Sequence, residues 1–334
     1  MQTAGLIDLQ VNGYAGVDFN DPDIDAAALD HALAAMQRSG VTTCLPTVIT
    51  APTEILSARL SALDRAVAVS RLGPVMVPGF HLEGPFLNPA QGFAGCHEAA
   101  AIAPPDPAVL QRLTAGLVRP VLLLTLAPER DGAVDLIGWA RTHGMAVAVG
   151  HSAAEEDVVQ RAVQAGATLS THLGNGVPQT LPKFRNPLMA QLAEDQLFAS
   201  FIADGIHIPG RTLKVFIRAK GPQRTVLVTD ATAAAAAPPG LYRFAGLTIE
   251  GALNGSVRVP GSGQLAGSAL CLDQAVRNLV SWGIVGPETA IHCASTNPAA
   301  VIRQALRAHR ISLRPATITW SAALRPSLAA GRDA

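Results

Sequence analysis

Eight short apolar runs, rich in β-branched residues, recur along the first 230 residues of this 334-residue chain, and helical patterns separate most of them. Parallel strands that are buried on both faces have this continuous apolar character. The runs are Ile7–Val11, Val41–Pro46, Val75–Leu82, Val121–Leu126, Met145–Val149, Thr168–Thr171, Leu197–Ile202 and Thr225–Thr229. Eight βα units in about 230 residues predict an α/β fold of the (β/α)8 TIM-barrel type. A doubly wound open sheet is the alternative.

After Asp230 the pattern changes. Residues 238–260 predict a β excursion from the loop that follows the eighth strand, and the tail from Ala316 is rich in Pro, Gly and charge, so we expect it to fray. The further predicted elements are the strands Leu241–Phe244, Leu247–Glu250 and Thr317–Trp320 and the helices Ser268–Trp282 and Pro298–His309. We therefore predict one catalytic barrel domain over residues 1–334.

Charge and composition exclude several classes of partner. The chain has 25 basic and 25 acidic residues and no long basic run, so we expect no nucleic-acid partner. No unbroken apolar stretch of about 18 residues is present, which argues against a membrane span. The first residues lack a signal-peptide pattern, and the four cysteines form no CxxC pair. Both features favour a cytoplasmic protein with reduced thiols.

Polar side chains gather where the apolar runs end. In barrel enzymes the carboxyl ends of the strands converge on one active site, so these residues should face a common volume. They are Asp8, Gln10 and Asn12 after the first strand, His81 and Glu83 after the third, His151, His172, Asp204 with His207, and Asp230 after the last four. The sequence Ser152–Glu155 fits a capping box, which predicts a helix directly after His151.

One carboxylate and two imidazoles, Glu83, His151 and His172, form a plausible ligand set for a divalent ion with an open position for water. Such an ion lowers the pKa of a bound water, and Asp230 could accept the proton and pass it to a leaving amine. Each residue alone has a structural explanation: a satisfied buried His, a hydrogen-bonded carboxylate, a helix N-cap. Polar groups at six strand ends favour the site. We interpret His81 as structural.

Six segments resemble the N-acetylglucosamine-6-phosphate deacetylases of the amidohydrolase superfamily. They run in the family's order and cover most of residues 5–280. The segments are GLIDLQVNGYAGVDFND (5–21), HLEGPFLNP (81–89), the stretch 150–178, IADGIHI (202–208), LVTDATA (227–233) and LAGSALCLDQAVRNLV (265–280).

The resemblance implies a role for each matching residue. Glu83, His151 and His172 would be the metal ligands, and Asp230 would be the general base and then the general acid. His97 would contact the acyl carbonyl and stabilise the oxyanion. The substrate would be held by His207 and by the backbone at Cys96, Asn175, Gly176, Leu265, Ala266 and Gly267.

The first strand distinguishes one metal from two. Many members of the superfamily carry His-x-His there and hold two ions, whereas this chain has Gln10 and Asn12. Neutral amides are poor zinc ligands, so we interpret the pair as a vacated second-metal position and expect one divalent ion. Zinc fits two His and one carboxylate, and iron, manganese and cobalt are alternatives.

Two features separate the chain from the family's pattern. The family's small β-sandwich is expected to be missing or vestigial, with 311–334 as its remnant. The 174–187 loop is longer, so either Arg185 or Lys183 could be the sugar-phosphate ligand. The resemblance implies a homodimer. We expect a deacetylase for N-acetylglucosamine 6-phosphate; the alternatives are a related amidohydrolase for another N-acyl substrate, with or without a phosphate, and a non-catalytic binding barrel.

Overall fold

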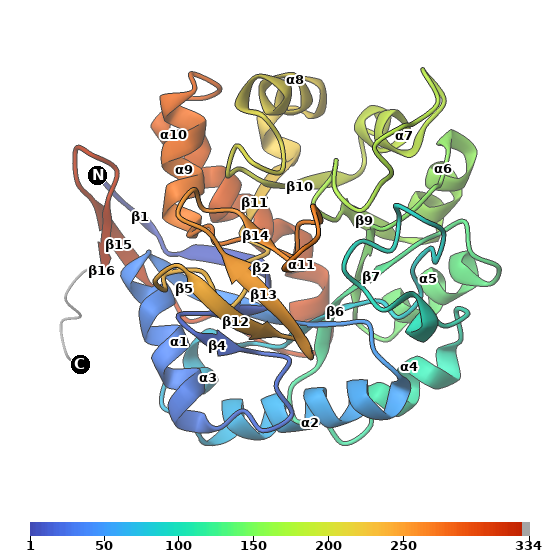
Figure 1. The fold of residues 1–334 in the computed structure, drawn as a ribbon, viewed down its shortest axis with the longest axis horizontal. Helices are drawn as coiled ribbons and strands as arrows, with labels where there is room; N and C mark the ends of the chain where they lie inside the picture. Colours follow the sequence, from blue (N-terminus) through green and yellow to red (C-terminus); the bar gives the residue numbers. More distant parts are fainter. Residues whose placement is uncertain (329–334) are drawn as a thin grey trace.

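A computed structural model describes residues 1–328. Its central feature is an eight-stranded parallel sheet that curls into a barrel, with helices around the outside (Figure 1). The strands, in their order around the sheet, are β2 (Leu6–Val11), β5 (Val41–Ile49), β6 (Phe80–Glu83), β7 (Val121–Leu126), β8 (Ala146–Val149), β9 (Ala167–Ser170), β10 (Phe198–Ile202) and β11 (Thr225–Val228). The predicted (β/α)8 architecture is therefore confirmed.

The barrel closes between its first and last strands. The Asp230 N–H donates to the Gln10 carbonyl at 2.9 Å, and the Asn12 N–H donates to the Ala231 carbonyl at 2.7 Å. The Asp8 carboxylate reinforces this contact, because it accepts the Thr229 hydroxyl at 2.6 Å and the Thr229 N–H at 3.2 Å. A carboxylate inside the barrel thus ties β2 to β11 directly below the strand ends.

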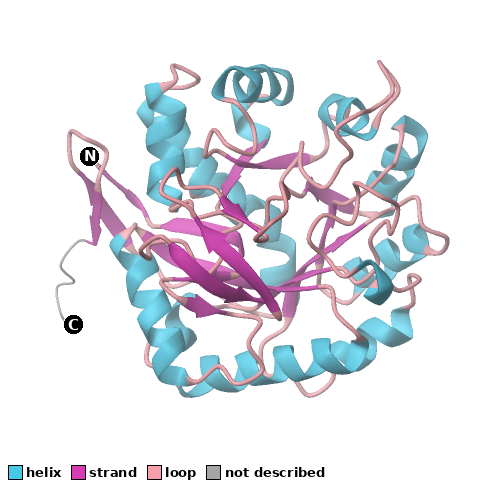
Figure 2. Cartoon of the chain, viewed as in Figure 1, coloured by secondary structure: helices cyan, strands magenta, loops and turns pink. Residues whose placement is uncertain are grey.

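Helices follow most of the strands and cover the barrel (Figure 2). They bury an apolar face against the sheet, as amphipathic surface helices do. They are α1 (Ala26–Arg38), α2 (Thr53–Val69), α3 (Gly73–Met76), α4 (Pro107–Thr114), α5 (Ala133–Thr142), α6 (Glu156–Ala165), α7 (Pro187–Ala193), α8 (Gly210–Lys220), α9 (Leu272–Ser281), α10 (Pro287–Ala294) and α11 (Thr296–Ala308), with 3-10 turns at Ala99–Ala101 and Pro222–Arg224. Among residues 1–328, no helix combines the length and the apolar character needed to cross a membrane.

The predicted β excursion is confirmed. It is a three-stranded antiparallel sheet, β12 (Gly240–Phe244), β13 (Leu247–Gly251) and β14 (Val257–Arg258), inserted after β11. A two-stranded ribbon, β3 (Gly13–Tyr14) and β4 (Val17–Asp18), follows β2. The Ala245 N–H donates to the Asp18 carboxylate at 2.7 Å, so the excursion is anchored on this ribbon.

The observed elements differ from the expected ones in the following places. The third strand begins at Phe80, because Pro74 starts the short helix α3 in the preceding residues. The helix Pro287–Ala294 was not predicted. The tail does not fray as far as residue 328: β15 (Thr317–Trp320) pairs with β1 (Gln2–Ala4) and with β16 (Pro326–Leu328). The rest of the expected fraying concerns residues 329–334, which lie outside the described part of the chain.

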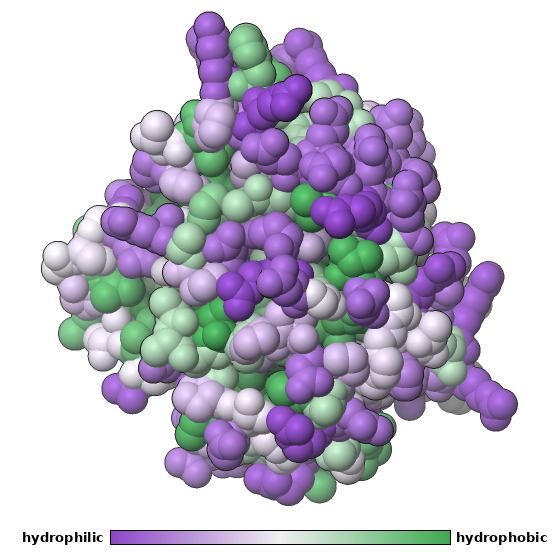
Figure 3. Space-filling model, turned by 90° about the vertical axis from the view of Figure 1, so that its right-hand side faces the viewer, coloured by the Kyte–Doolittle hydropathy of each residue, from purple (hydrophilic) through white to green (hydrophobic). Residues whose placement is uncertain are grey.

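Figure 3 looks onto the side of the molecule that is on the right in Figure 1, where α4 to α7 lie. On this face hydrophobic residues form small patches between hydrophilic ones (Figure 3). Small scattered apolar patches are ordinary for a protein surface exposed to water.

Candidate metal-binding active site

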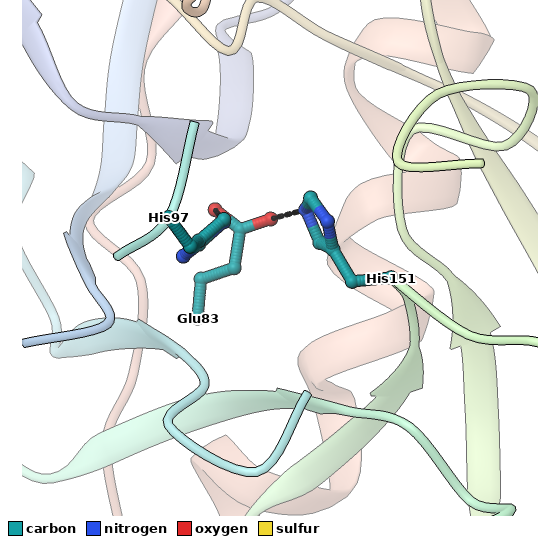
Figure 4. Close-up of side chains that lie close together, drawn as sticks. All are labelled: Glu83, His97 and His151. Atoms are coloured by element: carbon teal, nitrogen blue, oxygen red, sulfur yellow. Dashed lines mark ion pairs between the residues drawn. The ribbon is translucent and has the colours of Figure 1, made fainter. Parts of the chain in front are cut away.

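Glu83, the last residue of β6, lies at the centre of a buried cluster of imidazoles. Its Oε1 is 3.0 Å from His172 Nε2 and 3.3 Å from His151 Nε2, and its Oε2 is 3.9 Å from His97 Nε2. Figure 4 shows the carboxylate between His97 and His151. All four residues are buried. The strand ends of β6, β8 and β9 therefore bring Glu83, His151 and His172 together as the sequence predicted.

The ring of His151 has a defined orientation. Its Nδ1 is 2.7 Å from the Phe93 carbonyl, which can only accept, so Nδ1 carries the proton. In the neutral ring Nε2 then presents a lone pair to the Glu83 carboxylate, and it makes no hydrogen bond within residues 1–328. Two lone pairs that face each other in a buried site repel unless a cation lies between them.

The other imidazoles also leave buried nitrogens unused. His97 Nδ1 and His172 Nδ1 lack hydrogen-bond partners in the described part of the chain. One ligand atom each from Glu83, His97 and His151 lies within 4.8 Å of the others, and His172 contacts the same carboxylate. Imidazole and carboxylate groups with such unsatisfied lone pairs fit a divalent ion of the zinc type.

Mutual contacts set the protonation of this cluster. Burial opposes ionisation of Glu83, but the close contacts with the imidazoles of His151 and His172 hold the pKa of its carboxyl well below the usual range. For His172, burial is outweighed by the bond to Glu83, which raises its pKa. Burial and the neighbouring His151 lower the pKa of His97 to about 3, so His97 is neutral at physiological pH. The cluster thus contains a firmly ionised carboxylate beside a neutral imidazole.

Gln10 and Asn12 face the two carboxylates of the site with their amide groups. Gln10 Nε2 donates to Glu83 Oε1 at 3.1 Å, and Asn12 Nδ2 donates to Asp230 Oδ1 at 2.7 Å. Each of these carboxylates therefore has an amide N–H donor on one of its oxygens.

Asp230 follows β11 at the closing edge of the barrel and is buried. Burial, followed by the nearby Glu83 carboxylate, raises the pKa of Asp230 to about 6. A carboxylate with a pKa close to neutrality can both take and return a proton, as general acid–base catalysis requires.

The backbone at the strand ends is unusual. His151, His172 and Asp230 have φ angles of 51°, 28° and 48°, in the left-handed region that non-glycine residues seldom adopt. Strained residues of this kind cluster at functional sites, where the surroundings hold them in place. Gly176 allows the close packing around His151, because a Cβ there would lie 2.6 Å from His151 Nδ1.

Glu129 is the main positioning residue that the sequence reasoning missed. It accepts hydrogen bonds from the Ser152 hydroxyl at 2.6 Å, the Ala153 N–H at 2.6 Å and the Asn88 side chain at 2.8 Å. The Asn88 N–H in turn donates to the His151 carbonyl at 3.1 Å. Glu129 lies three residues beyond β7, and the rule of polar residues at strand ends, applied to this strand as well, would have found it.

The same contacts explain why the predicted capping box is wrong. The Ser152 hydroxyl donates to Glu129 instead of capping a helix, and α6 begins only at Glu156. The residues after His151 therefore form a loop that is fixed by Glu129.

The candidate substrate-binding residues differ in whether their polar groups are already engaged in hydrogen bonds. His207 Nδ1 contacts Asp204 Oδ2 at 2.6 Å, which leaves its Nε2 for a ligand. The Asn175 side chain is turned to the His172 carbonyl. The Ala266 N–H donates a hydrogen bond to the Val257 carbonyl at 3.1 Å, so this N–H is not free to bind substrate.

The other predicted contacts are placed as follows. Cys96 lines a cavity with His97, Leu265 pairs with Arg258 in an isolated bridge, and Gly267 packs against the Asp230 backbone. Lys183 and Arg185 are exposed.

Arg185 lines a cavity of about 510 Å³ together with Phe184 and with Glu155, Glu156 and Asp157 at the start of α6. The metal-site imidazoles do not line this cavity. Within one copy of the chain, Arg185 therefore shares this cavity with acidic side chains and not with the metal-site imidazoles.

The fold and the cluster together define a class: barrel proteins with a metal-binding carboxylate–imidazole site at the carboxyl ends of the strands. Comparison with known proteins agrees. Residues 1–305 match the model of the amidohydrolase family. The chain belongs to the amidohydrolase family.

Individual relatives point to one branch of it. The N-acetylgalactosamine-6-phosphate deacetylase of Escherichia coli O157:H7 is 35% identical over 299 residues, covering 89% of this chain and 76% of the relative. The N-acetylglucosamine-6-phosphate deacetylase of Mus musculus is 34% identical over 312 residues, covering 89% and 73%. A mutant N-acetyl-D-glucosamine-6-phosphate deacetylase of Mycobacterium smegmatis, solved in complex with N-acetyl-D-glucosamine-6-phosphate, is 29% identical with a TM-score of 0.85, covering 97% of this chain and 84% of that one.

Proposed function

We propose that this chain is a metal-dependent deacetylase that hydrolyses an N-acetyl amino sugar 6-phosphate to acetate and the free amine. The observation that carries the proposal is the buried Glu83 carboxylate surrounded by three imidazoles, with Asp230 beside it. A divalent ion, most simply zinc, would be held there and would supply a polarised acyl carbonyl and an acidified water. Asp230 then accepts the proton of the attacking water and donates it to the departing amine.

The proposed ligands are Glu83, His151 and His172, and His97 is proposed to donate a hydrogen bond to the acyl oxygen. His97 is also close enough to Glu83 for both to bind one ion. Replacing each imidazole separately therefore tests which histidine binds the metal and which contacts the acyl oxygen. His172→Gln is expected to lose most of the bound metal, whereas His97→Gln is expected to keep it and to lose turnover. Metal analysis after gel filtration measures both. Loss of metal in His97→Gln alone would exchange the two assignments.

A single ion is proposed because Gln10 and Asn12 direct amide donors at both carboxylates. About one equivalent of metal per chain is expected, and two tightly held equivalents would contradict this reading. Less than about half an equivalent after purification without chelators would favour a non-catalytic binding barrel instead.

Glu129 is proposed to hold the loop after His151 and thereby the ligand geometry. Glu129→Gln retains one acceptor oxygen, but it replaces charge-assisted bonds with weaker neutral ones. Outer-shell substitutions typically cost about 10- to 100-fold in metal affinity or activity, and we expect a loss in this range. Competition with a chelator measures it. Glu155→Gln, on the exposed loop before α6, is the matched control and should leave metal affinity unchanged.

The substrate class comes from the relatives, which include deacetylases for both glucosamine and galactosamine derivatives. We expect acetate release from N-acetylglucosamine 6-phosphate or its galactosamine epimer with the metal-loaded protein. No release from either sugar phosphate by folded, metal-loaded protein would contradict the proposal.

A second candidate, an unphosphorylated N-acyl substrate, is favoured by the exposed positions of Arg185 and Lys183. The measurement is kcat/KM for phosphorylated and unphosphorylated N-acetyl hexosamines. A preference above about tenfold (about 1.4 kcal/mol) for the phosphorylated form would argue against it.

Further parts of the proposal concern organisation. We propose one catalytic domain, in which the sheet of β1, β15 and β16 corresponds to part of the family's small β domain. We propose a homodimer, in which Arg185 or Lys183 of one copy could reach the phosphate bound by the other. The four cysteines are free, which suits the proposed cytoplasmic location.

A further inference from the structure

A cavity of about 380 Å³ lies beside the metal cluster and shares His97 with it. Its size is within the range of small-molecule sites. Apolar side chains form much of its wall, and one cation, Arg59 of α2, completes it. The lining residues used below are Ile49, Ala51, Arg59, Cys96, His97, Ala245, Leu247 and Val259, and we call this space the Arg59 cavity.

Arg59 is a buried cation with few partners. Its residue is only 7% exposed, and its one hydrogen bond runs from Nη2 to the Ala245 carbonyl at 2.9 Å. A guanidinium has five N–H donors, and Arg59 Nε is buried without a partner in the described chain. No carboxylate of residues 1–328 forms an ion pair with it within 4.0 Å. A buried charge without a paired counter-ion is costly.

The nearby carboxylates of Asp18 and Glu98 favour the charged form of Arg59 electrostatically, but neither pairs with it directly. Asp18 is buried and accepts the N–H groups of Asn20 and Ala245. Glu98 lines the cavity but is exposed to solvent. The cavity therefore offers a guanidinium toward apolar walls, and this combination matches a ligand with a short apolar chain and an anionic end.

We propose that the Arg59 cavity binds the carboxylate of a short-chain acid. A carboxylate pairs with a guanidinium through two parallel hydrogen bonds, and Ile49, Leu247 and Val259 would surround its aliphatic part. Because the cavity lies beside His97, a ligand in it would be close to the acyl group that the proposed reaction hydrolyses. Hydrolysis of an N-acyl amine by one water gives one carboxylate and one amine, and His97 is the proposed acyl-oxygen contact.

Two sources of such a carboxylate follow, and both rest on the proposed function. One is the free acid after hydrolysis. The other is the far end of a dicarboxylic acyl group still attached to the amine. The cavity is much larger than an acetyl methyl requires, since a single water occupies only about 30 Å³.

Calorimetric titration of the metal-loaded protein with propionate tests the site without turnover. Arg59→Met keeps an unbranched side chain and removes the buried charge, so it should fold, which thermal unfolding checks. We expect Arg59→Met to weaken propionate binding by at least about tenfold. Arg59→Lys, which keeps the charge but loses the paired donors, should bind propionate more weakly than the unsubstituted protein and more tightly than Arg59→Met. Because carboxylates also bind divalent ions, the titration is repeated after metal removal, and the dependence on Arg59 should persist.

The outcomes separate the proposals. Equal propionate binding by the unsubstituted protein and Arg59→Met, or no binding by either, overturns the Arg59 site whatever the deacetylase assay shows. Binding that depends on Arg59 in a protein without deacetylase activity supports the site and contradicts the proposed function. The kcat/KM values for N-acetyl and N-succinyl amino sugar 6-phosphates then distinguish the two sources. A higher kcat/KM for the succinyl compound that depends on Arg59 identifies the ligand as the far carboxylate of the acyl group. If the succinyl compound shows no such gain, the ligand is the free acid.

Discussion

Replacing Asp230 with Asn is expected to lower kcat by about 10²- to 10⁴-fold, the range typical for loss of a general acid–base group. Asparagine has nearly the same shape, and it can still contact Asn12, which now donates to Asp230 Oδ1 at 2.7 Å. Its amide, however, cannot accept a proton from water or return one to the amine. Steady-state kinetics on the metal-loaded variant measures the loss.

Metal content and folding serve as controls for this variant, since Asp230 is not a proposed ligand. Unchanged metal and unfolding temperature with lost turnover would support the assignment, and near-normal turnover would mean that another group moves the proton. The pH profile adds a second test. The pKa of Asp230 lies at about 6, so the base is ionised above this pH and kcat/KM should fall as the pH decreases below it. A bound cation would move this limb to lower pH.

Glu83→Gln is expected to abolish both metal binding and activity. Glu83 is the only carboxylate in the proposed ligand set, and three imidazoles surround it. A neutral amide is a poor ligand for a zinc-like ion, and it removes the negative charge that balances the cation. Metal analysis and acetate release are the measurements, and Glu250→Gln, on the exposed face of β13, is the matched control.

Stability separates loss of the ion from loss of the fold. A bound ion stabilises the folded state by mass action, so removing metal from the unsubstituted protein should lower its unfolding temperature. The Glu83→Gln protein should be insensitive to a chelator. A variant that keeps a full equivalent of metal would show that Glu83 is not a ligand.

Much of the barrel could be predicted from the sequence because buried parallel strands must be apolar on both faces. Val121–Leu126 was predicted at its observed bounds, and the other strands begin or end within a few residues of prediction. Val75–Leu82 failed in its first half, since Val75 and Val77 are apolar but follow Pro74 into a short helix. Composition alone does not separate a buried helix turn from a strand.

The prediction that the tail frays was wrong for a different reason. Its Pro and Gly content indicated fraying, but β15 pairs with β1 from the other end of the chain. The strand Thr317–Trp320 itself was predicted at its observed bounds, but nothing local to it indicates a partner more than 300 residues away in the sequence.

The sequence by itself determined which residues stand at the ends of the strands, and therefore that Glu83, His151, His172 and Asp230 would share one site. Only the tertiary structure decided how they face one another. The left-handed backbone at His151 and the hydrogen bonds from the following loop to Glu129 depend on contacts between loops. Strand periodicity is a local property of the chain, whereas hydrogen bonds between loops join residues that are far apart in the sequence.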